Sequence, residues 1–128
     1  METILIADDE VHILNVLAWK LRNAGYQVVT AADGHEALEL AKSKQPDLLI
    51  TDYQMPLLSG LELCTRMHAD PTTCDIPAIL LTARGYDLPV TGATDTNIKG
   101  VAAKPFSPQN VVELVQDVLR AVQVASTT

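Results

Sequence analysis

The chain has 128 residues, of which 48% are apolar, and it carries a formal net charge of −7. This length fits one globular domain, and the apolar fraction is too high for a disordered chain. The acidic balance argues against direct binding of nucleic acid, which requires clustered lysine and arginine. The longest apolar runs are strand-sized and the N-terminus lacks a basic flank, so we expect neither a membrane span nor a signal peptide.

Five strands are predicted along the chain, because short apolar runs alternate with amphipathic stretches. The runs that predict strands are Thr3–Ala7, Gln27–Ala31, Asp47–Thr51, Ala78–Thr82 and Gly100–Ala103. The third and fourth runs are apolar without alternation, which is typical of strands that are covered on both faces.

Helices are predicted between and after these strands, over Val11–Ala24, Gly34–Lys44 and Leu61–His68 and from Pro108 onward. Asp33 and Ser107 stand where helix caps are expected. A further stretch, Tyr86–Lys99, contains Pro89 and Gly92, and these residues cost about 3 and 1 kcal/mol inside a helix relative to alanine. We therefore expect only a short or irregular helix there. The last residues, 125–128, are expected to fray beyond a single domain over 1–124.

Strands that alternate with helices predict an α/β fold, with a doubly wound parallel sheet and helices on both faces. Ligands of such sheets bind beyond the carboxyl ends of the strands. The polar residues that could form a functional site in this chain lie at those ends. Asp8 and Asp9 follow the first strand, Asp52 closes the third, Thr82 closes the fourth and Lys104 follows the fifth.

An aspartate after a strand is often only a helix cap, but a coincidence at four strand ends favours a site. Two carboxylates about 4 Å apart repel by roughly 4 kcal/mol at an effective dielectric near 20, so a cluster needs protonation or a cation. An open cluster of oxygen ligands suits Mg²⁺, and we expect Asp8, Asp9, Asp52 and the main-chain carbonyl of Gln54 to hold it. Asp52 can then act as the nucleophile on an activated phosphoryl group.

The two remaining polar side chains fit the same chemistry. The Lys104 ammonium can pair with one phosphoryl oxygen, and the Thr82 hydroxyl can donate to another. The residue types at the strand ends therefore predict phosphoryl capture.

Four motifs then resemble the receiver domain of two-component response regulators, over nearly the whole chain. They are Ile4–Glu10, Asp52–Pro56 with Gly60, Leu81–Arg84 and Ala103–Phe106. The resemblance implies a flavodoxin-like sheet of order 2-1-3-4-5. It also implies a histidine kinase or phosphotransfer protein as donor to Asp52, a protein target or effector domain downstream, and a cis peptide before Pro105.

Several positions depart from the family pattern or qualify it. Val101 stands at the position where the family has an aromatic residue that turns inward on phosphorylation. Two interpretations remain: residues 85–99 pass on the signal instead, or Val101 is simply a filled core position. By the same resemblance, Gln54 and Arg84 border the attacking water. Trp19 lies away from the apolar stripe of its helix, which leaves two interpretations: partial burial against a neighbouring helix, or docking of the kinase.

Three other functions agree less well with these residues. A haloacid-dehalogenase-like phosphatase would need an acid two residues after its nucleophile, where this chain has Gln54. A degenerate receiver used only for docking would not need the complete set of polar side chains. A flavin or nucleotide binder would need a glycine-rich loop after the first strand, not Asp8 and Asp9. The two cysteines, Cys64 and Cys74, are expected to be reduced thiols in a cytoplasmic protein.

Overall fold

The computed structural model describes residues 2–82, 97–103 and 107–127, with side chains as far as residue 121. The elements are β1 (Thr3–Ala7), α1 (Val11–Asn23), β2 (Gln27–Ala31), α2 (Gly34–Lys44), β3 (Leu48–Asp52), α3 (Gly60–Ala69), β4 (Ala78–Thr82), β5 (Ile98–Ala103) and α4 (Pro108–Thr127). The bounds of β1, β2, β4 and α2 are those predicted. The end of α1 differs by one residue, and β3 and α3 each differ by one residue at both ends.

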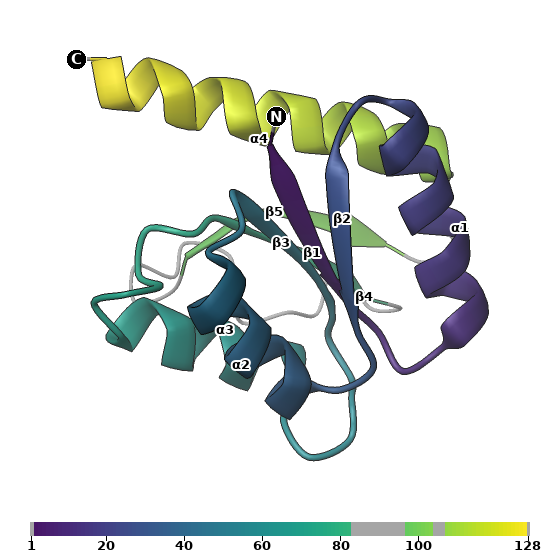
Figure 1. The fold of residues 1–128 in the computed structure, drawn as a ribbon, viewed down its shortest axis with the longest axis vertical. Helices are drawn as coiled ribbons and strands as arrows, with labels where there is room; N and C mark the ends of the chain where they lie inside the picture. The colour runs from purple at the N-terminus through teal and green to yellow at the C-terminus, as the bar shows by residue number, and fades with distance from the viewer. Residues whose placement is uncertain (1, 83–96, 104–106, 128) are drawn as a thin grey trace.

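The strands form one parallel sheet in the order β2-β1-β3-β4-β5 (Figure 1). This confirms the predicted architecture and strand order. The chain moves from β1 outward to β2, and then crosses back to place β3 on the other side of β1. In sheets of this kind the point where the order reverses is where ligands bind, beyond the carboxyl ends of the strands. That point lies between β1 and β3.

Helices cover both faces of the sheet, α1 and α4 on one and α2 and α3 on the other (Figure 1). In β1 the side chains of Ile4 and Ile6 pack toward α1 and α4, whereas Leu5 and Ala7 pack toward α2 and α3. Every residue of β3 and β4 is buried, which explains why these strands read as continuous apolar runs.

The largest departure from the prediction is at β5, which starts two residues early. Its pairing with β4 shifts between Ala78 and Ile79, so Lys99 has no Cα partner in β4. The helix predicted over residues 86–99 falls mostly on 83–96, outside the described residues. Its last two residues belong to β5, so the prediction is wrong there.

At the C-terminal end α4 continues to Thr127. The predicted domain end at residue 124 and the predicted fraying of 125–128 stay predictions. Within the described ranges, every helix is too short or too polar to cross a membrane.

Candidate functional site

The first part of the site is the turn between β1 and α1, which carries Asp8 and Asp9. The Asp8 side chain is fully buried, and its Oδ1 accepts a hydrogen bond from the backbone N–H of Glu10 at 2.9 Å. Its own N–H donates to the Ala31 carbonyl in the neighbouring strand at 3.1 Å. The helix N-cap is Glu10, without a side-chain cap bond, so neither aspartate serves as the cap. Both aspartates instead owe their positions to the end of β1, which they follow directly. The side chain of Asp9 is exposed.

The second part is Asp52, the last residue of β3. Its side chain is 7% exposed, and the next residue, Tyr53, donates its N–H to the Leu81 carbonyl at 2.8 Å. The start of α3 lies directly against this strand end. A Cβ added at Gly60 would approach the Asp52 carbonyl carbon to 3.0 Å and its oxygen more closely still, so only glycine fits there. The backbone of Asp52 is therefore held on both sides.

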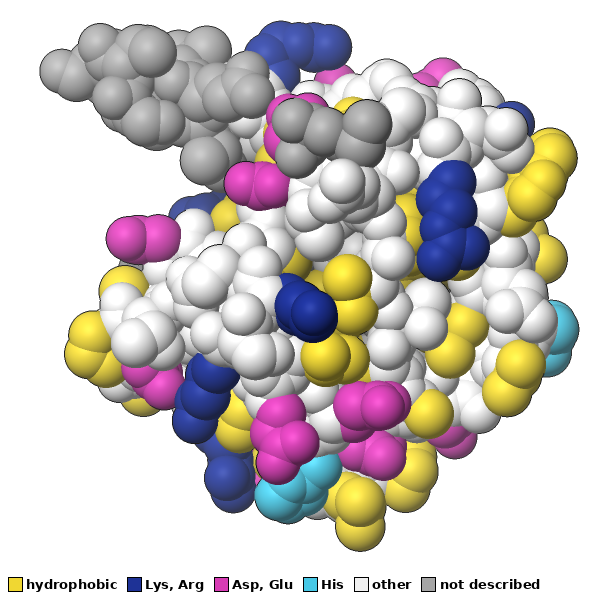
Figure 2. Space-filling model, viewed as in Figure 1, with side chains coloured by type: hydrophobic (Ala, Val, Ile, Leu, Met, Phe, Trp, Pro, Cys, Tyr) yellow, Lys and Arg dark blue, Asp and Glu magenta, His cyan; other side chains and the backbone are white. Residues whose placement is uncertain are grey.

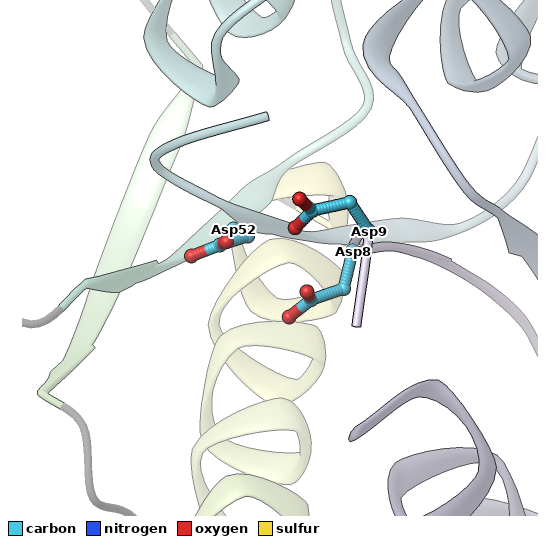
Figure 3. A group of neighbouring side chains, drawn as sticks. All are labelled: Asp8, Asp9 and Asp52. Carbon is cyan, nitrogen blue, oxygen red and sulfur yellow. The ribbon is translucent and has the colours of Figure 1, made fainter. Parts of the chain in front are cut away.

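The three carboxylates converge, although they come from two strand ends (Figure 3). One oxygen of each of Asp8, Asp9 and Asp52 lies within 4.8 Å of the others. At that distance two unit charges repel by about 3.5 kcal/mol at an effective dielectric near 20. Oxygen donors at this spacing suit a hard divalent cation, and the exposure of Asp9 leaves room for water ligands, which Mg²⁺ retains. The residues present therefore fit a cation.

Thr82 lies beside the cluster, at the end of β4. The residue before it, Leu81, pairs with Asp52, and Thr82 itself pairs with Ala103 at the end of β5. Its side chain is 3% exposed. Lys104 follows Ala103 directly in the sequence. The side chains of Lys104, Arg84 and Pro105 lie outside the described residues, so their predicted places stay predictions.

Two residues singled out from the sequence are more exposed than a core role requires. Val101 is 39% exposed on the edge strand β5, so it is not a filled core position. Trp19 is 66% exposed on α1, so most of its side chain faces solvent. Val16, one turn earlier, is 47% exposed and adds to the same apolar face.

The contacts of the loop between β3 and α3 are not evident from the sequence. Leu58 is buried against α2 and α3, and its N–H donates to the Pro56 carbonyl at 2.8 Å. Leu57 between them has a φ of +72°, which is rare for leucine. In this part of the sequence, Gly60 alone indicated a structural constraint. A distant glycine, Gly34, touches this loop in the structure.

A separate hollow of about 910 Å³ lies at the opposite rim, between the carboxyl ends of α2 and α3. Its lining includes Asp47 and Pro77, which precede β3 and β4, so it is distant in the fold from Asp52 at the other end of β3. The Asp8, Asp9 and Asp52 cluster is the better candidate because it gathers converging charged groups at the point where the strand order reverses.

Comparison with known sequences agrees with the geometry. A family model described as "Response regulator receiver domain" matches residues 4–116. The chain is 37% identical over 119 residues to the phosphate regulon transcriptional regulatory protein PhoB of Pseudomonas aeruginosa, a match that covers 93% of this chain and 52% of that protein. It is 34% identical over 123 residues to the alkaline phosphatase synthesis transcriptional regulatory protein PhoP of Bacillus subtilis, covering 96% of this chain and 50% of that protein.

The chain thus spans about half the length of these curated relatives. Both are named as transcriptional regulators, so the prediction that this protein contacts no nucleic acid finds no support in them.

Solved structures are similar over nearly their full length. The chemotaxis protein CheY4 of Vibrio cholerae is 30% identical, with a TM-score of 0.85, and the match covers 92% of this chain and 98% of that one. The receiver domain of the sensor histidine kinase PA1611 of Pseudomonas aeruginosa is 25% identical, with a TM-score of 0.81, and the match covers 92% and 97%. That structure has a magnesium ion coordinated in its active-site cleft.

Proposed function

Because this chain belongs to the family of response regulator receiver domains, we propose that Asp52 is its phosphoacceptor. Asp8, Asp9 and Asp52 would hold Mg²⁺, with the main-chain carbonyl of Gln54 as a further ligand. The observation that carries the proposal is the convergence of three carboxylate oxygens within 4.8 Å at the carboxyl end of the sheet. Such a cluster is costly unless a cation or a proton offsets the repulsion.

The reaction follows from the residues at this rim. An Asp52 carboxylate oxygen attacks the phosphorus of a phosphohistidine, the phosphorus–nitrogen bond breaks, and the released imidazole takes up a proton. The product is an aspartyl phosphate. When bound, Mg²⁺ would neutralise charge on the phosphoryl oxygens and on the carboxylates. The protein's chemistry would be limited to forming and hydrolysing this bond on its own aspartate.

Two further side chains would stabilise the transferred group. The Thr82 hydroxyl, at the end of the strand next to β3, would donate to one phosphoryl oxygen. The Lys104 ammonium would pair with another. Loss of either should slow phosphoryl capture more than it weakens cation binding, because neither is a metal ligand in this proposal.

The donor would be a histidine kinase or a phosphotransfer protein that docks beside the acceptor. Trp19, 66% exposed with Val16 on the same face of α1, is the apolar surface that we assign to this contact. An aromatic side chain held in solvent is typical of a protein interface. The free thiols, Cys64 and Cys74, fit a cytoplasmic location for this exchange.

The downstream partner would be a protein target or an effector domain, which binds a surface of this receiver that changes when Asp52 is phosphorylated. PhoB and PhoP, about twice as long as this chain, are transcriptional regulators, and a regulator of that class is one such output. Val101, without an aromatic ring and 39% exposed, would not provide the usual inward swing of the switch side chain. Residues 85–99, the alternative path predicted for the phosphorylation signal, lie mostly outside the described residues.

The test is phosphorylation by a small acyl phosphate in the presence of Mg²⁺, followed by intact mass spectrometry. One labile phosphoryl addition is expected, and it should disappear with a chelator and in Asp52→Asn. Asp33→Asn is the matched control, because Asp33 caps α2 and asparagine caps equally well. Absence of the addition in the native protein, or its persistence in Asp52→Asn, would overturn the proposal.

A further inference from the structure

The first residue of α2, Gly34, lies in close contact with the loop that follows the acceptor. A Cβ built at Gly34 would come within 2.6 Å of the Leu58 Cβ and closer still to the Leu58 carbonyl oxygen. Real Cβ atoms do not approach other atoms this closely, and one of the two neighbours is backbone. Gly34 has an ordinary negative φ, because only Gly25 among the described glycines has a positive one. Glycine is therefore needed here for space and not for backbone conformation.

Leu58 cannot easily move away from an added methyl group. Its side chain is 3% exposed and packs in the core between the sheet, α2 and α3. Its N–H closes a three-residue turn onto the Pro56 carbonyl at 2.8 Å, with Leu57 at a φ of +72°. That left-handed conformation persists only where the surroundings hold it. A push on Leu58 would therefore be passed along the loop.

The other end of the loop is attached to the acceptor. The Gly60 N–H donates to the Tyr53 carbonyl at 2.8 Å, and the Gly60 Cα lies against the Asp52 backbone. The Tyr53 N–H in turn donates to the Leu81 carbonyl at 2.8 Å. The loop thus starts and ends at Asp52, and Gln54, the proposed carbonyl ligand, lies within it. A displacement of Leu58 would therefore shift these residues.

The start of α2 is itself held in place, so it would not retreat from the loop. The Asp33 side chain accepts from the Glu36 N–H at 2.8 Å, and the Glu36 side chain accepts from the Ala32 N–H at 2.7 Å. These reciprocal bonds fasten the first turn to the end of β2. Both partners at the Gly34–Leu58 contact are therefore fixed.

We propose that Gly34 is a positioning residue for the phosphoryl site. It lets α2 seat against Leu58, and through the 53–60 loop it keeps Asp52 and the Gln54 carbonyl in line with Asp8 and Asp9. The proposal rests on the function proposed above, because it concerns cation binding and phosphoryl capture at that same site.

The decisive variant is Gly34→Ala. Alanine favours a helix more than glycine does, so the change would be neutral or stabilising if space were unimportant. We expect instead that Mg²⁺ affinity falls roughly tenfold or more, since disturbing the groups that orient metal ligands typically costs about 10- to 100-fold in metal affinity. The readouts are the Mg²⁺ dissociation constant by titration calorimetry and the Mg²⁺ concentration for half-maximal phosphorylation by an acyl phosphate.

Two control variants separate positioning from a general loss of structure. In Gly100→Ala the added methyl meets the end of the flexible Leu114 side chain at 3.2 Å, on the other face of the sheet. In Val118→Ala the same core loses buried volume, which lowers stability without touching the loop. Both should keep Mg²⁺ affinity within about twofold of the native protein while folded. A merely structural role for Gly34 would make Gly34→Ala behave like Val118→Ala, and that result would overturn the inference.

A measurement on the native protein covers the case in which Gly34→Ala does not fold. In an NMR titration with Mg²⁺, the amide signals of Gly34 and Leu58 should shift with the same midpoint as that of Gly60, whereas the Gly25 amide should stay in place. Unmoved Gly34 and Leu58 signals would refute the coupling. Failure of the native protein to bind Mg²⁺ at all would refute the proposed function instead, so the two failures are distinguishable.

Discussion

Asp9→Asn should stabilise the folded protein when no divalent cation is present. Three carboxylates whose nearest oxygens lie within 4.8 Å form three repelling pairs, and Asp9 takes part in two of them. At 4.8 Å each pair costs about 0.9 kcal/mol at the dielectric of water and about 3.5 kcal/mol at an effective dielectric near 20. Because Asp9 is exposed, the lower figure is the better guide, and removing two pairs should raise the free energy of unfolding by about 2 kcal/mol.

Mg²⁺ should offset this gain in stability to the extent that the variant binds Mg²⁺ more weakly than the native protein does. A ligand that binds only the folded state stabilises it by about 2.7 kcal/mol at a hundred times its dissociation constant. Each tenfold loss of affinity in Asp9→Asn removes about 1.4 kcal/mol of that gain at saturation. The stability gap between variant and native protein should therefore narrow as Mg²⁺ is raised.

The assay is urea unfolding followed by circular dichroism, at low ionic strength, with chelator and over a series of Mg²⁺ concentrations. Asp75→Asn is the matched control, because Asp75 is exposed at the opposite rim, beside the 910 Å³ hollow. It should change stability by less than about 0.5 kcal/mol and respond to Mg²⁺ as the native protein does. If Asp9→Asn were less stable than the native protein in chelator, or if its stability gap ignored Mg²⁺, the electrostatic reasoning would be wrong.

Three other predictions concern the rest of the surface and core. Hydrogen bonds from Ser59 hold the pKa of Glu62 below its usual range, so its contribution to stability is present above the unfolded pKa and is lost as pH falls through the folded one. Glu62→Gln should therefore be less stable than the native protein at neutral pH and equally stable in acid, as measured by urea unfolding; a constant difference would contradict this. Trp19→Ala should slow phosphoryl transfer from the cognate kinase roughly tenfold or more, the usual cost of losing an interface aromatic, yet leave transfer from an acyl phosphate unchanged. Burial raises the pKa of the Cys64 thiol to about 12, so iodoacetamide at pH 8 should alkylate Cys74 first, and equal rates by mass spectrometry would refute the burial of Cys64.

The fold was predictable because its strongest signals are local. The apolar run of β4 and the Asp33 cap of α2 each follow from neighbouring residues. The convergence of Asp8 and Asp52 was also predictable, since parallel strands bring their carboxyl ends to one rim whatever the details of packing.

Other features depend on contacts that no local pattern encodes. The shifted pairing that leaves Lys99 opposite no residue of β4 depends on how two distant strands meet. The same is true of Gly34, which reads as an ordinary first residue of a helix until Leu58 is placed beside it. Trp19 belongs to a third kind: periodicity put it off the core stripe, but only the packed structure shows that no described helix covers it.

The most direct test of the account is the location of the phosphoryl group. The protein would be phosphorylated with an acyl phosphate and Mg²⁺, treated at once with borohydride, which reduces an aspartyl phosphate to homoserine, and mapped by peptide mass spectrometry. The account predicts homoserine at residue 52 and at no other aspartate, and none when Mg²⁺ is withheld. Homoserine at Asp8 or Asp9, or its absence from residue 52, would contradict the assignment of Asp52 as the acceptor.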